Sequence, residues 1–64
     1  MEKFMVGDYI LSKRFGWQYR IYAIKNGSIY IQDVVKENLR LAFSRSALAL
    51  RIKNEVYLHS PHPF

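Results

Sequence analysis

The richest chemical feature of this sequence is the segment over residues 13–20, which mixes cationic side chains with aromatic rings around Gly16. Its cations are Lys13, Arg14 and Arg20, and its rings are Phe15, Trp17 and Tyr19. Lysine and arginine neutralise phosphate groups, and exposed rings stack on unpaired bases for about 1–3 kcal/mol each. The segment therefore predicts a surface that binds an acidic polymer. In the competing interpretation, Trp17 and Tyr19 complete a thin core and the charges lie at its rim.

A second group of cations lies in the other half of the chain and consists of Arg40, Arg45, Arg51 and Lys53. If residues 39–43 and 48–52 form neighbouring strands, Arg40 and Arg51 point outward together, and Arg45 lies near one edge. A groove between these cations and the first loop would then fit a phosphate backbone. The alternative is a scattered, solvated surface.

Four aromatic rings allow a different chemistry, and they belong to Tyr9, Trp17, Tyr22 and Tyr30. Such rings can cage a methylated cation beside an aspartate, or line a groove for a proline-rich peptide. Both ligands usually carry positive charge. The net charge of +5 therefore disfavours both interpretations.

Metal binding and catalysis have weaker support. His59 and His62 are spaced so that both imidazoles could chelate, but without a cysteine or a third placed ligand they fall short of a structural site. The sequence has no cysteine nucleophile, no glycine-rich phosphate loop and no acidic cluster, and no serine is spaced to pair with a histidine and an acid. We therefore expect a protein that is not an enzyme and that uses no metal and no cofactor.

Length and composition limit the chain to one small domain. Half of its 64 residues are apolar, which disfavours disorder, but so short a chain has a thin core. No disulfide can brace that core, so a homodimer is open beside a monomer. No targeting signal is visible, and no apolar run approaches the roughly 20 residues that cross a bilayer. We therefore expect a cytoplasmic protein that makes no membrane contact.

Alternating side chains predict a β-hairpin of residues 18–24 and 29–34. The Asn26-Gly27 pair between them tolerates the two positive φ angles of a type I′ turn. The alternation places Tyr19, Ile21 and Ala23 on one face of the first strand, and Arg20, Tyr22 and Ile24 on the other. The parity of Tyr19 with Ile21 predicts that its ring lies in the core.

The second half of the chain is compatible with two structures. Apolar residues at 35, 39, 42, 43, 47 and 50 form a helical stripe. That helix would leave Leu41, Leu48 and Ile52 off the stripe, whereas two strands place all three on one face. We therefore predict strands here, separated by a single helical turn near residues 44–47 that Ser44 caps. A short strand over residues 55–58 follows, and the prolines at 61 and 63 predict a flexible tail over residues 59–64.

This order of elements resembles the SH3-like small barrels, including the Tudor and KOW groups. The residues that carry the resemblance are Val6-Gly7-Asp8-Tyr9-Ile10, Tyr19-Arg20-Ile21 and Ser46-Ala47-Leu48, within residues 5–53. It implies an all-β fold over residues 1–58, a single SH3-like barrel of about five antiparallel strands with one short helical turn. The alternative is an α+β fold, with a three-stranded meander plus one helix over residues 36–50. SH3-like barrels bind many kinds of partner, so the fold by itself names none.

Two functions follow as hypotheses. The first is a non-enzymatic module that binds nucleic acid, DNA or RNA, through a basic and aromatic surface. The second is a protein–protein interaction module, such as a small phage-type inhibitor or an accessory adaptor, that docks on an acidic surface of a larger enzyme or complex. The same residues are expected to serve either partner: Lys13, Arg14, Phe15, Trp17, Arg20, Arg40, Arg45 and Arg51.

Overall fold

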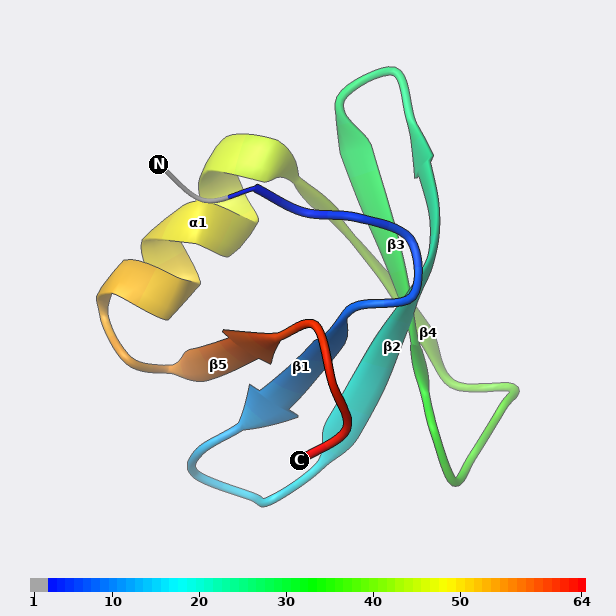
Figure 1. The fold of residues 1–64 in the computed structure, drawn as a ribbon, viewed down its shortest axis with the longest axis vertical. Helices are drawn as coiled ribbons and strands as arrows, with labels where there is room; N and C mark the ends of the chain where they lie inside the picture. The colour runs from blue at the N-terminus through cyan, green and yellow to red at the C-terminus, as the bar shows by residue number, and fades with distance from the viewer. Residues whose placement is uncertain (1–2) are drawn as a thin grey trace.

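The computed structural model describes residues 3–64. Its elements are β1 (Tyr9–Ser12), β2 (Gln18–Lys25), β3 (Ser28–Asp33), β4 (Arg40–Ser44), α1 (Arg45–Lys53) and β5 (Tyr57–Ser60). The five strands form one antiparallel sheet in the order β4-β3-β2-β1-β5 (Figure 1). The predicted class, a small antiparallel domain of five strands with a short helical element, is confirmed. The predicted closed barrel is wrong, because β4 and β5 are the two edges of an open sheet.

The predicted hairpin is confirmed as β2 and β3. Asn26 and Gly27 have φ angles of 51° and 79°, so both residues adopt the left-handed conformation that a type I′ turn requires. Along β3, Ile29 and Ile31 are fully buried, and the residues between them face the other side. Strict alternation on this strand therefore separates a core face from an outer face.

A β-bulge at Tyr22 corrects the predicted faces of β2. Ile21 pairs with Ile31, but the next pair joins Ala23 to Tyr30, so Tyr22 is an extra residue. An extra residue reverses the side-chain parity beyond it. Ile24 therefore packs against the core, and the placement of Ala23 on the core face is wrong.

The stretch predicted as two strands is one strand followed by one helix. β4 is present, but residues 45–53 form α1 in place of a single turn and a second strand. Ser44 is extended and its Oγ accepts the N–H of Ala47 at 3.1 Å, which confirms Ser44 as the cap. A helix that starts at residue 45 places Leu48 and Ile52 four residues apart on its inner face. The helix considered in the sequence analysis started at residue 36, nine residues before α1, and that start left Leu48 and Ile52 off its apolar stripe.

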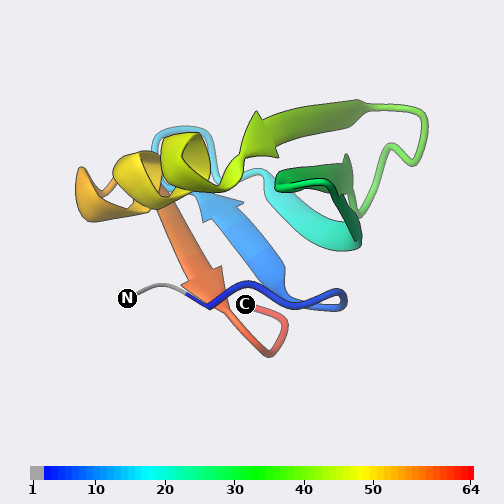
Figure 2. The ribbon, with the colours of Figure 1, turned by 90° about the horizontal axis from the view of Figure 1, so that it is seen from above.

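Helix α1 covers the core face of the sheet between its two edges (Figure 2). The core consists of Phe4, Ile10, Tyr19, Ile21, Ile29, Ile31 and Leu48. Leu48 is the fully buried side chain that α1 contributes, and it belongs to the same core cluster as the buried isoleucines of the sheet. Within residues 3–64, no helix is long and apolar enough to span a bilayer.

Strand β5 continues two residues further than predicted. It covers Tyr57–Ser60 and pairs antiparallel with β1, so that His59 lies opposite Ile10. His59 and Ser60 are therefore part of the sheet and not of a tail.

Candidate nucleic-acid interface

The outer face of the sheet, which points away from α1 and the core, carries a row of polar and aromatic side chains. The register pairs Tyr9 with Arg20, Arg20 with Gln32, and Gln32 with Arg40. Residues paired directly across an antiparallel sheet have Cβ atoms about 5 Å apart. The row therefore crosses four strands without a break and places a guanidinium on β2 and another on β4.

The Tyr22 bulge adds aromatic surface beside this row. The ring of Tyr22 lies 6.2 Å from the ring of Tyr30, and the guanidinium of Arg40 lies 5.4 Å from the Tyr22 ring. Tyr22 remains 39% exposed. A cation above a ring attracts it electrostatically, and the pair offers both a flat face and a positive charge to a ligand.

A hollow of about 250 Å³ opens on the outer face. Its lining residues are Tyr9, Arg20, Tyr22, Gln32, Asp33, Val34 and Glu37. The hollow therefore combines three hydrogen-bonding strands with the start of the β3–β4 loop.

The first loop presents a stacked pair of rings. Phe15 and Trp17 lie 4.6 Å apart at an interplanar angle of 17°, and they are 57% and 51% exposed. The guanidinium of Arg14 lies 5.4 Å from the Phe15 ring. The loop is held by two backbone bonds, in which the N–H of Ser12 donates to Trp17 O and the N–H of Gly16 donates to Ser12 O. Tyr19 is buried, as its parity predicts, and Trp17 lies outside the core.

A groove of about 390 Å³ separates this loop from the β3–β4 loop. Its lining residues are Gly16, Trp17, Gln18, Asp33, Val34, Val35, Lys36 and Leu39. Asp33 and Val34 line both the groove and the hollow. The rings of the first loop and the rings of the outer face therefore belong to one continuous surface, which we call the outer surface.

Asp33 fixes the loop between the two depressions. Its Oδ1 accepts the N–H groups of Val35 and Lys36, both at 2.8 Å. The bond from Lys36 and then that from Val35 hold the pKa of this carboxyl below its ordinary value. Burial, with Tyr57 and the Asp33 carboxylate close by, raises the pKa of Tyr19. Asp33 is therefore ionised at neutral pH. Its carboxylate holds in place the loop that lines both the hollow and the groove.

Three arginines of the outer surface have no acidic partner among residues 3–64. In the part of the chain that the structure describes, no carboxylate lies within 4.0 Å of the guanidinium groups of Arg14, Arg20 or Arg40. Lys13 differs, since its Nζ lies 3.5 Å from Glu55 Oε1 in an exposed ion pair. Three guanidinium groups on this surface are therefore available to an anion.

Arg45 and Arg51 do not join that surface. Both belong to α1, where the guanidinium of Arg51 lies 4.7 Å from the Phe43 ring and donates to Ala47 O at 3.3 Å. The guanidinium of Arg45 lies 6.0 Å from the ring of Phe4. The prediction that neighbouring strands bring Arg40 and Arg51 together is wrong, because residues 45–53 are helical.

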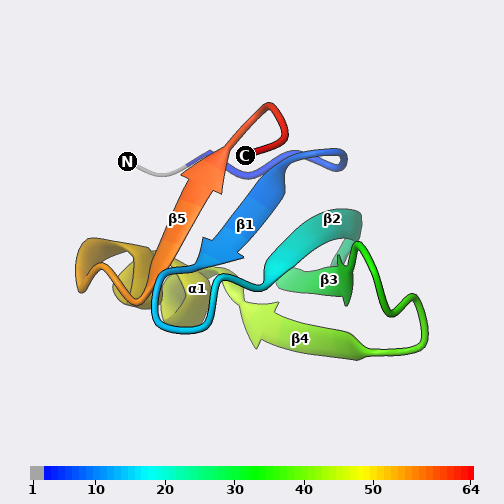
Figure 3. The same ribbon diagram turned by 90° about the horizontal axis from the view of Figure 1, so that it is seen from below.

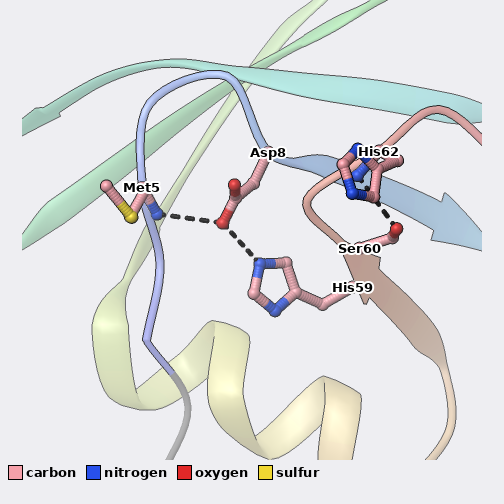
Figure 4. Close-up of polar contacts among 5 residues, drawn as sticks. All are labelled: Met5, Asp8, His59, Ser60 and His62. Atoms are coloured by element: carbon pink, nitrogen blue, oxygen red, sulfur yellow. Dashed lines mark hydrogen bonds and ion pairs between the residues drawn. The ribbon is translucent and has the colours of Figure 1, made fainter.

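The histidine predicted to lie in a tail instead contacts the start of β1 (Figure 4). His59 Nε2 lies 2.7 Å from Asp8 Oδ2, which also accepts the N–H of Met5 at 3.0 Å. His62 is not part of this pair, and its N–H donates to Ser60 Oγ. No group of three potential metal ligands occurs within residues 3–64. The Asp8–His59 pair connects β5 to the residues that precede β1.

Sequence reasoning missed Gln32 as part of the surface, and assigned Tyr9 and Tyr30 only to a cation cage or a groove for a proline-rich peptide. The signal that could have found them is parity, since each alternates with a buried isoleucine. Parity does not show which residues of different strands lie opposite one another, and here the bulge decides that.

No protein-family model, curated protein or solved structure matches this chain. The fold and the outer surface together define a small antiparallel β domain with a basic and aromatic sheet face.

Proposed function

We propose that the protein binds single-stranded nucleic acid across the outer surface. The observation that carries the proposal is the cross-strand row in which Arg20 and Arg40, without carboxylate partners in the described chain, lie beside the exposed ring of Tyr22 and the half-buried Tyr9 and Tyr30. Guanidinium groups contact phosphates, and flat rings stack on bases. An open sheet face presents guanidinium groups and rings side by side, because they lie on neighbouring strands.

The stacked rings favour a single strand over a duplex. Phe15 and Trp17 present their faces on a loop, and Tyr22 presents its ring beside Arg40. A ring stacks on a base only when that base is not already stacked within a duplex. The groove between the two loops connects these sites, so that an extended strand can contact both.

The direct test is the double variant Arg20→Ala/Arg40→Ala, measured by fluorescence anisotropy with labelled single-stranded DNA and RNA. Each phosphate contact on a single strand contributes about −0.7 to the slope of log K against log salt. We expect the double variant to bind more weakly, with a slope that is less steep by about 1.4. The matched control is Arg45→Ala/Lys53→Ala, which removes the same two charges from α1 and should bind like the wild type.

Three outcomes contradict the proposal. The first is an absence of binding by the folded wild type at low salt, and the second is an unchanged slope in the double variant. The third is a higher affinity for duplex than for single strands of the same sequence. An absence of binding together with capture of one acidic protein would instead support the interaction-module hypothesis.

A further inference from the structure

The outer edge of the sheet at β4 has no partner in the described chain. β4 pairs with β3 on one side only, and Figure 3 shows it as the outermost strand, with no segment beyond it. An unpaired edge presents a row of free N–H and C=O groups to another strand. The question is which of these groups face outward.

Two backbone hydrogen bonds between β3 and β4 show which backbone groups of β4 face outward. The N–H of Asp33 donates to Leu39 O at 3.0 Å, and the N–H of Arg45 donates to Gly27 O at 3.1 Å. In an antiparallel ladder, hydrogen-bonded and non-hydrogen-bonded pairs alternate. The odd-numbered residues of β4 therefore bond to β3, and the backbone groups of Arg40 and Ala42 and the N–H of Ser44 face outward. The C=O of Ser44, as that of the helix cap, accepts the first hydrogen bond of α1.

The β4 edge lacks the features that usually block strand pairing. It has no proline and no bulge, and Arg40 at its start is its single charge. The opposite edge differs. On β5 the N–H of Lys13 donates to Val56 O, which by the same alternation turns Tyr57 and His59 outward, and Pro61 then removes the next donor. β4 is therefore the edge that can accept a further strand.

We propose that β4 pairs antiparallel with β4 of a second copy of this chain, about a two-fold axis at Ala42. An axis at Ala42 pairs every residue with outward backbone groups inside the two strands. An axis at Leu41 or Phe43 would instead set Ser44 opposite residue 38, or Arg40 opposite residue 46, and both of these lie outside β4. An axis at Arg40 would place two guanidinium-bearing residues directly opposite each other, which is unfavourable. An axis at Ser44 would bring the two helix starts together. Ala42 is therefore the position that avoids all of these defects.

The edge is complementary to itself in this register. Ala42 lies opposite Ala42 of the second copy, and Arg40 lies opposite Ser44 of the second copy, so no like charges meet. On the core side, Leu41 faces Phe43 of the second copy. Both side chains are only partly buried in one chain, and pairing covers them further. The short interface predicts a weak, concentration-dependent dimer.

The inference is independent of the proposed function, since it concerns the edge and not the outer surface. The test measures the mass of the full chain by sedimentation equilibrium over micromolar to submillimolar concentrations. We expect a monomer–dimer equilibrium for the wild type. Ala42→Lys places two ammonium groups opposite each other and should weaken dimerisation by at least about tenfold. Ala42→Glu should do the same, and an equal mixture of the two variants should restore the dimer.

The control is Asn54→Lys, which adds the same charge beyond the end of α1 and should dimerise like the wild type. A wild type that stays monomeric throughout the concentration range overturns the inference, and so does a closed ring larger than a dimer. The inference also fails if Ala42→Lys and Ala42→Glu dimerise as strongly as the wild type. It fails as well if the mixture of the two variants dimerises no more strongly than either variant alone. Circular dichroism of each variant verifies the fold.

Discussion

At the scale of single residues, Asp33 links the stability of the domain to the shape of its surface. One carboxylate oxygen accepts two loop N–H groups, and the same residue lines both the hollow and the groove. An Asx-type arrangement of this kind fixes a loop without any long-range contact. The outer surface therefore depends on one side chain that does not itself carry positive charge or an aromatic ring.

The lowered pKa of Asp33 predicts a pH-dependent contribution to stability. A carboxyl whose pKa is lower in the folded state stabilises the protein fully at pH values above its unfolded pKa, which is about 4 for aspartate. That stabilisation is lost as the pH falls through the pKa of the folded state. Asp33→Asn removes this titration. We expect wild type to exceed the variant in free energy of unfolding at pH 7, and the difference to shrink below pH 4. Urea unfolding at a series of pH values measures it, and a constant difference would contradict the assignment.

The arginines show how one side chain type serves two purposes in a thin domain. Arg51 lies over the Phe43 ring and covers apolar surface with its stem, as long cationic side chains commonly do. Arg40 also lies over a ring, that of Tyr22, but on the exposed face of the sheet. Position on the fold, and not residue type, separates a structural cation from a candidate ligand contact.

At the scale of elements, the change from β4 to α1 decides the architecture. Ser44 is both the last residue of the strand and the cap of the helix. Its Oγ satisfies one of the N–H groups that a helix start leaves without a partner. The basic residues Arg51 and Lys53 in the last turn complement the negative end of the helix dipole.

Loss of the cap should weaken the helix and the domain together. Ser44→Ala is expected to lower the free energy of unfolding by about 1 kcal/mol, the usual cost of a lost N-cap. Ser46→Ala is the control, because it removes the hydroxyl that lies 3.4 Å from Ser44 Oγ but leaves the bond from the N–H of Ala47 in place, and it introduces a better helix former. Thermal and urea unfolding measure both variants. Equal losses in the two variants would contradict a capping role for Ser44.

At the level of the whole molecule, the two edge strands β4 and β5 are not joined to each other as they would be in a closed barrel. Other contacts must therefore stabilise the edges of the sheet. Helix α1 contacts β3, β4 and β5, and so connects the two edges across the core face. The Asp8–His59 contact connects β5 with the turn before β1, next to the ring of Phe4. The first of these contacts joins the two edges of the sheet through α1, and the second joins β5 to the segment before β1.

A double-mutant cycle should detect the second of these contacts. Asp8→Asn and His59→Gln each remove one charged or titratable partner of a largely buried pair, 2.7 Å apart. We expect a coupling energy of about 1 kcal/mol in urea unfolding at neutral pH. The N–H of Met5 donates to the same carboxylate, so its amide hydrogen should exchange faster in Asp8→Asn. Strict additivity of the two variants would show that the pair contributes nothing.

The dimer proposed at β4 would place the outer surfaces of the two copies side by side. Tyr30 pairs with Ala42 inside one chain, and Ala42 would pair with its copy. The cross-strand rows of the two chains would then lie on one face of a ten-stranded sheet. A single strand of nucleic acid could contact both copies without leaving that face.

The central hairpin and the burial of Tyr19 could be predicted from the sequence alone, whereas the place of Trp17 could not. Period-two alternation and the Asn26-Gly27 turn are local signals, and they predicted β2, β3 and the buried isoleucines of β3. The burial of Tyr19 followed from the same parity, since this ring alternates with Ile21 on the core face of β2. Local chemistry was sufficient at these positions because no distant contact opposes it.

Only the tertiary structure decided where strand gives way to helix and which cations share a surface. Leu41 and Leu48 pack on the same core from a strand and from a helix, so an apolar pattern alone does not separate the two. The bulge at Tyr22 sets Arg20 opposite Gln32, and the helix removes Arg51 from Arg40. The physical reason is that register and helix placement are fixed by packing between residues distant in sequence.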